Sequence, residues 1–373
     1  MTTERRSRAL ARAGAVLEVD LAAIVENWRR LAARLAPGAS CAAVVKADAY
    51  GLGMARVAPR LAAAGCRLFF VATIDEGIAL RRVLPGIEIA VLGGFLPGTG
   101  GEFTRTRLIP VLNSADEIDA WRANPRTRAF PAMIHVDTGM ARLGLARDEL
   151  AALAGAPERL AGLQLRAVLS HLACAEDAGA RQNSEQLAAF RAALGLLPQA
   201  PASLAAGSGI FLGPDYHFAF VRPGAALYGV NPLPGRPNPM AQVVRLKGRI
   251  LQVRDIDTGM TVGYGATHRM ERPGRIATVA VGYADGWLRS GSHRGSAGIA
   301  GRRVPVVGRI SMDLLTLDVT GIDPALARPG NFVDLMDDTY GVDEVAAAAG
   351  TIGYEILTAL GQRYHRIYRG EAG

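Results

Sequence analysis

Short apolar runs alternate with amphipathic segments through the first 230 residues of the chain. A strand-like run at 16–20 and a helical segment at 21–35 come first. Eight further apolar runs follow, separated by Ala, Leu and Arg-rich segments with helical spacing. These runs lie at 41–45, 67–71, 88–92, 108–111, 130–136, 165–170, 202–206 and 219–221. Eight strands that alternate with helices predict an α/β fold, a parallel (β/α)8 TIM-type barrel, with a doubly wound sheet as the alternative.

The pattern changes at 231–239, where four prolines in nine residues exclude a helix or a central strand and indicate a linker. Beyond the linker, short Val and Ile-rich runs bounded by Gly, Pro and Asp predict a small, mostly β domain. They lie at 243–253, 276–281, 304–307 and 314–319, and a helical segment at 342–360 precedes an Arg-rich tail. We therefore predict a barrel at 14–236 and a mostly β domain at 237–373, with which the N-terminal strand within 1–20 packs.

Composition excludes several classes of protein. The chain has 373 residues, half of them apolar, and a formal charge of +8, but its Arg pairs are scattered among acidic residues. We expect no nucleic-acid partner, because there is no basic block with interleaved aromatic residues. No apolar run approaches the roughly 20 residues of a membrane span. Arg12 and Glu18 interrupt the only apolar patch near the amino terminus, so we predict a cytoplasmic protein. Three cysteines at unrelated spacings favour reduced thiols over a disulfide or a metal site.

The distribution of lysine singles out one candidate for covalent chemistry. Only two of the 42 basic residues are lysines, Lys46 and Lys247, and the other 40 are arginines. Lys46 ends the first barrel strand, where a partly desolvated amine can lose its proton and attack a carbonyl, as arginine cannot. A Schiff-base lysine is one interpretation, and a surface lysine left by chance is the other. Tyr50 follows one turn later, and Gly51 and Gly53 let the backbone approach an anion.

Other polar residues follow later strands of the predicted barrel, at the end where barrel enzymes gather their chemistry. Arg142 follows the run at 130–136 and is suited to gripping a carboxylate, although a surface arginine is the simpler interpretation. His171 ends the next strand, where a hydrogen-bonded structural histidine is the common case. The turns at 207–209 and 222–229 follow strands seven and eight, where barrels often bind phosphate.

The stretch Val45-Lys46-Ala47-Asp48-Ala49-Tyr50-Gly51-Leu52-Gly53 resembles the pyridoxal-phosphate signature of bacterial alanine racemases, which are fold-type III enzymes. Further segments resemble motifs of the same family in the same order, so the resemblance covers nearly the whole chain. These segments are 137–144, 170–171, 206–209, 221–229, 262–268, 308–313 and 352–358.

The resemblance implies interconversion of L-alanine and D-alanine through an aldimine of pyridoxal 5'-phosphate. Lys46 would carry the cofactor and serve as one base, and Tyr264 of the partner subunit in a homodimer would serve as the other. Arg142 and Met312 would bind the substrate. Cofactor contacts would come from Tyr50, Arg142, His171, Ser208, Arg222, Gly224, Ala225 and Tyr354. Glu176, where the family usually has aspartate, would line the entrance with Tyr283, Arg289 and Arg309.

His171 is implied to pack beside the cofactor ring and to relay hydrogen bonds between Arg222 and the tyrosine base. Arg222 would face the pyridine nitrogen and, because it stays protonated, would not take up the nitrogen's proton. The ring would then be a weaker electron sink, which disfavours transamination.

One position departs from the family pattern. Where many members carry a carbamylated lysine that holds the arginine of the TGMxRxG motif, this chain has His135. We predict that a small anion, chloride first, or ordered water lies between His135 and Arg142, and that activity does not depend on bicarbonate.

Two other functions stay open at this point. A decarboxylase of basic amino acids shares the architecture and the lysine, and a non-enzymatic cofactor-binding regulator shares the barrel but lacks the second domain. The sequence does not decide between alanine and serine as substrates, nor between a role in cell-wall peptidoglycan synthesis and one in alanine catabolism.

Overall fold

The computed structural model describes residues 3–370, which divide into two compact units. Residues 24–227 and 231–241 form the barrel unit, and the described residues up to Ala23, together with 228–230 and those from Gln242 onward, form the β unit. The chain therefore enters the β unit before it builds the barrel, and it returns to the β unit afterwards.

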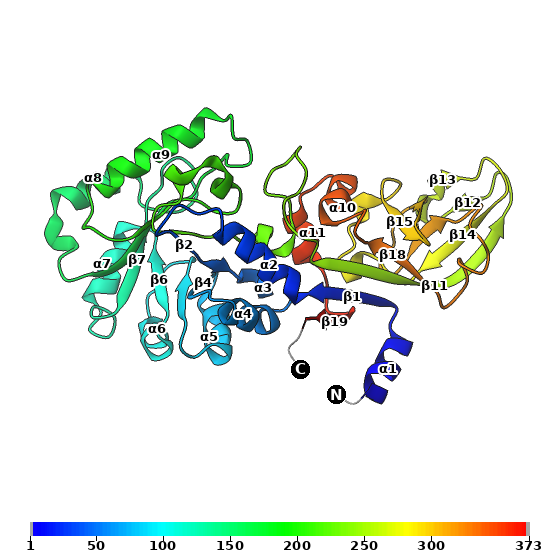
Figure 1. Cartoon of the computed structure of the whole chain (residues 1–373), viewed down its shortest axis with the longest axis horizontal. Coiled ribbons are helices and arrows are strands. Elements are labelled where there is room, and N and C mark those ends of the chain that lie inside the picture. The colour runs from blue at the N-terminus through cyan, green and yellow to red at the C-terminus, as the bar shows by residue number, and fades with distance from the viewer. Residues whose placement is uncertain (1–2, 371–373) are drawn as a thin grey trace. The chain divides into compact units, whose positions relative to one another are not determined.

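Parallel strands form the centre of the barrel unit (Figure 1). All eight predicted strands are present within the described residues. Seven pair in chain order: β3 (Ala43–Val44), β4 (Leu68–Val71), β5 (Glu88–Val91), β6 (Ile109–Leu112), β7 (Pro131–His135), β8 (Gln164–Leu169) and β9 (Ala202–Ser203). The eighth, β10 (Phe220–Val221), pairs in parallel with β2 (Ser40–Cys41). On its other side, Ala219 N–H donates to Ala202 O and Arg222 N–H donates to Ala205 O. The eighth strand thus joins the seventh to the first, as the barrel prediction requires.

Helices follow most barrel strands and surround the sheet (Figure 1). They are α2 (Leu21–Ala32), α3 (Lys46–Tyr50), α4 (Met54–Ala63), α5 (Ile74–Val83), α6 (Gly100–Thr106), α7 (Ala115–Ala123), α8 (Arg147–Gly155) and α9 (Arg181–Leu194). Apolar residues dominate the central strands because both faces of the sheet are covered, and all four residues of β4 and of β6 are buried. Between α6 and α7, Phe95, Phe103 and Trp121 meet edge to face with ring centroids 5.1–6.0 Å apart.

A mostly antiparallel sheet forms the β unit, where helix α1 (Thr3–Arg12) precedes β1 (Ala15–Asp20). The predicted runs correspond to β11 (Val244–Ile256), β14 (Gly274–Val279), β16 (Arg302–Pro305) and β17 (Leu315–Asp318). The pattern did not predict β12 (Thr261–Val262), β13 (His268–Arg269), β15 (Ser296–Ile299), β18 (Phe332–Met336) and β19 (His365–Arg369). β19 lies in the Arg-rich tail and pairs in parallel with β1, which pairs on its other edge with β11.

The helix predicted at 342–360 is wrong as a single element. The structure has two helices, α10 (Val342–Ala349) and α11 (Gly353–Ala359). Gly350 has a φ of 71° and ends α10, because the left-handed conformation turns the chain away from the helix axis. Residues 231–239 contain no helix or strand, as their prolines predict, and they belong to the barrel unit. Within the described residues, no helix is long and apolar enough to cross a membrane.

Candidate functional site

Lys46 stands at the start of an unusual turn directly after β3. Residues 47–50 follow it with φ values of 53–55°, so four consecutive non-glycine residues adopt the left-handed conformation. Each such residue costs about 1–2 kcal/mol, so the surrounding structure must hold the turn. Gly51 N–H donates to Ala47 O at 2.7 Å, and the Asp48 carboxylate accepts from Met54 N–H at 2.7 Å, at the start of α4. The turn therefore fixes the backbone from which the lysine side chain extends.

The Lys46 amine has an environment that favours its neutral form. Burial lowers its pKa, the positive charge of Arg142 lowers it further, and the negative charge of Glu76 opposes both. A larger fraction of the amine is therefore unprotonated at neutral pH than in an exposed lysine. The lone pair of a neutral amine is what attack on a carbonyl carbon needs.

Tyr50 is buried at the end of the same turn and lies against the loop after β10. A Cβ atom on Gly224 would lie 2.2 Å from the Tyr50 hydroxyl oxygen, so only glycine at this position allows the approach. Two neighbouring loops meet beside it: a Cβ on Gly207 would lie 3.4 Å from the Ala226 Cβ. Ser208 and Ala225 begin the two short 3-10 helices that leave these loops, Ser208–Leu212 and Ala225–Tyr228, and both residues are buried.

Arg222 is a buried cation that is held by neutral acceptors. Its Nη1 donates to Ser203 O at 3.0 Å and to Ser203 Oγ at 2.5 Å. Its Nη2 donates to Ser170 O at 2.6 Å and to His171 Nδ1 at 3.3 Å. Burial lowers the Arg222 pKa to about 10, so the guanidinium still carries its charge at neutral pH. These four bonds use the four terminal N–H groups and leave Nε–H as the donor for a ligand.

The Arg222 bond also defines the protonation of His171. A guanidinium can only donate, so His171 Nδ1 accepts and its Nε2 carries the proton. Burial, and with it the positive charges of Arg222 and Arg142, lower the His171 pKa to about 3. The imidazole is therefore neutral and presents an N–H at Nε2.

Arg142 is exposed on a loop whose backbone is tightly held. The Asp137 carboxylate accepts from the N–H groups of Gly139, Met140 and Ala141 at 2.9–3.2 Å. Burial alone would raise the pKa of Asp137, but these three donors lower it. Helix α9 supports the loop through two glutamines. Gln182 donates to Gly139 O at 2.8 Å, and Gln186 donates to Thr138 Oγ1 at 3.2 Å.

His135 contacts this loop from the end of β7. Its Nδ1 lies 2.8 Å from Asn113 Oδ1, and the Asn113 amide nitrogen donates to Leu92 O and Val111 O. Because that amide is oriented by two carbonyl acceptors, Asn113 Oδ1 must accept and His135 Nδ1 must carry the proton. Burial, and with it the positive charge of Arg222, lower the His135 pKa to about 4. His135 is thus neutral, with the lone pair on Nε2.

A second group of predicted residues comes together within the β unit. Tyr264 lies in the turn 263–266, and a Cβ on Gly265 would lie 2.9 Å from Arg309 Nη1. Tyr283 N–H donates to Ser311 O and Ala284 N–H donates to Met312 O, at 3.0 and 2.9 Å. Tyr264 is 72% exposed and Met312 is 54% exposed. Both side chains therefore lie on the surface of the β unit.

The remaining predicted residues have clear positions. Arg289 begins the 3-10 helix Arg289–Gly291, after which Ser292 Oγ accepts from Ile310 N–H at 3.0 Å. Tyr354 lies in the first turn of α11, and the exposed Glu176 follows β8 in the barrel unit. The barrel unit therefore unites Lys46 with the predicted residues whose contacts or charges reach one another: Tyr50, Arg142, His171, Arg222 and Gly224.

Sequence reasoning did not identify several residues that hold this arrangement. Ser203 and Ser170 are ordinary serines in the sequence, and only the fold shows that they bind Arg222. Glu76 accepts from Ala47 N–H at 2.7 Å, and a sequence motif could have identified it. Thr73-Ile74-Asp75-Glu76 is a capping-box pattern at the start of α5, and such a motif places a carboxylate at the end of a barrel strand.

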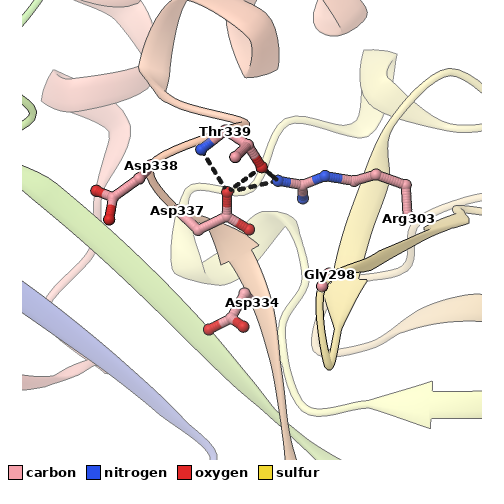
Figure 2. A pocket seen from close by; sticks show the side chains of 7 residues that line it. Gly298, Arg303, Asp334, Asp337, Asp338 and Thr339 are labelled. Atoms are coloured by element: carbon pink, nitrogen blue, oxygen red, sulfur yellow. Dashed lines mark hydrogen bonds and ion pairs between the residues drawn. The ribbon is translucent and has the colours of Figure 1, made fainter.

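The β unit also contains a cavity of about 250 Å³ lined by acidic residues (Figure 2). Arg303 Nη2 donates to Asp337 Oδ1 and to Thr339 Oγ1, both at 2.5 Å, and its guanidinium lies over the Tyr340 ring. Asp338 forms an ion pair with Arg245. These contacts pair the charges of Asp337 and Asp338, and burial raises the pKa of Asp334, so we assign the cavity no chemical role.

The closed parallel barrel and the mostly β unit define the fold class, and Lys46 at the end of the first barrel strand is its candidate amine nucleophile. Two family models match the chain: the alanine racemase N-terminal domain over residues 19–232 and the alanine racemase C-terminal domain over residues 243–368. The chain belongs to the alanine racemase family.

Individual alanine racemases are similar to this chain over almost its whole length. The alanine racemase of Rhodospirillum rubrum is 54% identical, over 96% of this chain and 97% of that protein. A catabolic alanine racemase of Mesorhizobium japonicum is 49% identical, over 96% and 94%. Among solved structures, alanine racemase from Bartonella henselae with covalently bound pyridoxal phosphate has a TM-score of 0.91 and 44% identity, covering 95% of this chain and 99% of that one.

Proposed function

We propose that this protein interconverts L-alanine and D-alanine with pyridoxal phosphate bound at Lys46. The observation that carries the proposal is the partly buried Lys46, whose pKa is lowered, at the end of the first barrel strand in a chain that both family models match. Its relatives include enzymes named as catabolic and as biosynthetic, so alanine is the substrate common to both roles.

The barrel residues fit the cofactor. Lys46 would hold it covalently, while the Tyr50 hydroxyl, Ser208 and the backbone at 224–225 would bind its phosphate. Arg222 is a buried charge among neutral acceptors, and its Nε–H suits an electron-rich ring nitrogen. When bound, pyridoxal phosphate withdraws electrons from the α-carbon of the amino acid and makes its C–H bond acidic.

Two groups on opposite faces of the bound amino acid would then remove and return the proton of its α-carbon. The neutral Lys46 amine would take or return it on one face, and the phenolic oxygen of Tyr264, supplied by the partner subunit, would do so on the other. A single base tends to return the proton to the face from which it came, so inversion needs both. His171 Nε2–H would donate to the phenolic oxygen and support its role as a base, because Nδ1 is already committed to Arg222.

The remaining predicted residues would bind the substrate and admit it. The exposed guanidinium of Arg142 can grip the alanine carboxylate, and Met312 would bound the small side-chain pocket. Glu176, Tyr283, Arg289 and Arg309 would line the entrance, and Tyr354 would contact the phosphate. These roles, the homodimer and the cytoplasmic location stay predictions from the sequence.

Borohydride reduction of the purified holoenzyme tests the proposal, because reduction links the cofactor permanently to the lysine that carries it. We expect the pyridoxyl group on Lys46 by peptide mass mapping. The chain has only one other lysine, Lys247, and an adduct there would contradict the assignment. A chiral assay should show D-alanine formed from L-alanine. Release of carbon dioxide from lysine, arginine or ornithine without racemisation of alanine would indicate the decarboxylase alternative.

A further inference from the structure

Glu76 connects the lysine-bearing turn to helix α5. Its Oε1 accepts from Ala47 N–H at 2.7 Å, the first residue after Lys46. Its Oε2 accepts from Ala72 N–H at 2.7 Å and from Thr73 N–H at 3.3 Å, while Thr73 Oγ1 accepts from Glu76 N–H. One carboxylate, 29 residues beyond Ala47, therefore ties the left-handed turn after the first strand to the end of the second strand.

A glutamate at the third position of a helix makes the same kind of contact at two other places in the barrel, so this part of the role of Glu76 is structural. Glu117 is the third residue of α7 and accepts from Phe95 N–H and Asn113 N–H at 3.1 Å. Glu149 is the third residue of α8 and accepts from Ala115 N–H at 3.0 Å and from Ala146 N–H at 2.9 Å. Each glutamate caps its own helix and holds an N–H from the preceding strand–helix unit. Glu76 alone among these three holds a residue adjacent to a lysine.

We propose that Glu76 is a positioning residue for Lys46: its carboxylate holds the strained turn in place and sets a negative charge beside the amine. The strained turn needs such a contact, because four left-handed residues are unfavourable unless neighbouring groups bind their backbone. Only the expected effect on transfer of the substrate proton rests on the proposed function.

The charges that face Lys46 come from several elements. Arg142, from the loop after β7, lowers the pKa of the amine, and Glu76 in α5 raises it. His171, after β8, is neutral because burial lowers its pKa to about 3, so it adds no charge near pH 7. Glu76 is therefore the negative group that limits how far burial and Arg142 lower the pKa of Lys46. Without this charge, the amine would be more fully deprotonated at neutral pH.

Competitive labelling with acetic anhydride over a series of pH values tests this inference on the full-length chain freed of bound cofactor. The extent of labelling at each lysine is read by peptide mass mapping, and Lys247 in the β unit is an internal reference. We expect Glu76→Gln to lower the apparent pKa of Lys46 and to raise its labelling at pH 7 about three- to tenfold. Lys247 should be unchanged.

Two variants separate the charge from the tie. Glu76→Ala should shift Lys46 in the same direction and also increase amide hydrogen exchange across residues 45–53, because Ala47 N–H loses its acceptor. Glu149→Gln, which removes the charge of the equivalent glutamate at α8, should leave the Lys46 profile unchanged. An unshifted Lys46 in Glu76→Gln, or an equal shift in Glu149→Gln, would overturn the proposal.

The labelling experiment does not require the protein to be a racemase, so its failure is distinguishable from failure of the proposed function. In the holoenzyme, the linked kinetic expectation is a shift of the pH profile of kcat to lower pH in Glu76→Gln. A fall in rate at every pH with an unmoved profile would assign Glu76 a purely structural role.

Discussion

At the residue scale, the site depends on neutral histidines beside fixed positive charges. His135 donates to Asn113, His171 accepts from Arg222, and the two bonds leave opposite ring nitrogens protonated. The two tautomers follow from the partners, because a guanidinium cannot accept and the Asn113 amide is oriented by two carbonyls. The anion predicted between His135 and Arg142, and the independence from bicarbonate, stay predictions; a neutral His135 is consistent with both.

The low pKa of His135 predicts a pH dependence of stability. The folded protein resists protonation of His135 down to about pH 4, whereas a histidine in an unfolded chain takes up its proton near its ordinary pKa of 6.5. Between these values the unfolded state binds more protons, so the free energy of unfolding falls as the pH falls. We expect His135→Gln to reduce this slope by about 1.4 kcal/mol per pH unit, measured by urea unfolding at several pH values.

A core substitution on the same strand is the matched control. Ile134→Val removes one buried methylene and should lower stability by about 0.5–1.5 kcal/mol at every pH without altering the slope. If His135→Gln and the wild-type protein keep the same slope, the buried neutral imidazole is not the source of the pH dependence.

At the element scale, single glycines and carboxylates decide where elements end. The apolar pattern at 342–360 is continuous enough to predict one helix, yet Gly350 divides it. Thr351 N–H donates to Ala346 O at 2.9 Å and Gly350 N–H donates to Ala347 O at 3.1 Å. These bonds satisfy the last carbonyls of α10 and reverse the chain, so α11 begins on a different axis.

Gly350→Ala should lower the free energy of unfolding by about 1–2 kcal/mol, because a side chain is strained at a φ of 71°. Thermal or chemical denaturation measures the change. Gly155→Ala is the control: it lies at the end of α8 outside the left-handed region, with nothing within 4 Å of the added Cβ. It should be neutral or slightly stabilising, since alanine favours helix. Equal losses in the two variants would contradict the role of the Gly350 conformation.

At the scale of the whole molecule, the predicted chemistry is divided between two units. Lys46, Arg142 and Arg222 belong to the barrel unit, and Tyr264 and Met312 belong to the β unit, where both are exposed. An exposed tyrosine in a turn built around two left-handed glycines is well placed to serve a second subunit. The proposed homodimer would give each site one group from each chain.

Subunit complementation tests this division. Lys46→Ala and Tyr264→Phe homodimers should each be nearly inactive, because each site lacks one of the two bases. After mixing and subunit exchange at equal amounts, half of the dimers are mixed and each contains one complete site. We expect recovery of about a quarter of wild-type activity. Native mass spectrometry confirms the exchange, and no recovery after confirmed exchange would mean that each site is built within one chain.

The sequence predicts correctly those elements that depend on residues close together in the chain. Eight barrel strands, the proline-rich stretch at 231–239 and the start of α4 near Met54 are readable because apolar runs, prolines and glycines act on the backbone nearby. Lys46 stood out because a strand end and the scarcity of lysine are both visible in the sequence. The strands β15 and β19 were missed because small, polar or charged residues become strands there through their partners, as β19 does against β1.

Only the tertiary structure decided how the site is held. The hydrogen bonds from Arg222 to its acceptors and from Ala47 to Glu76 join positions 19 to 52 residues apart, and the second of them holds the left-handed turn after Lys46. No local pattern encodes such pairings, because each depends on which strands lie side by side once the barrel closes. The same is true of the histidine tautomers, which are defined by partners from other strands and loops. The sequence therefore determined which side chains could carry the chemistry, and the closed barrel decided their charges and positions.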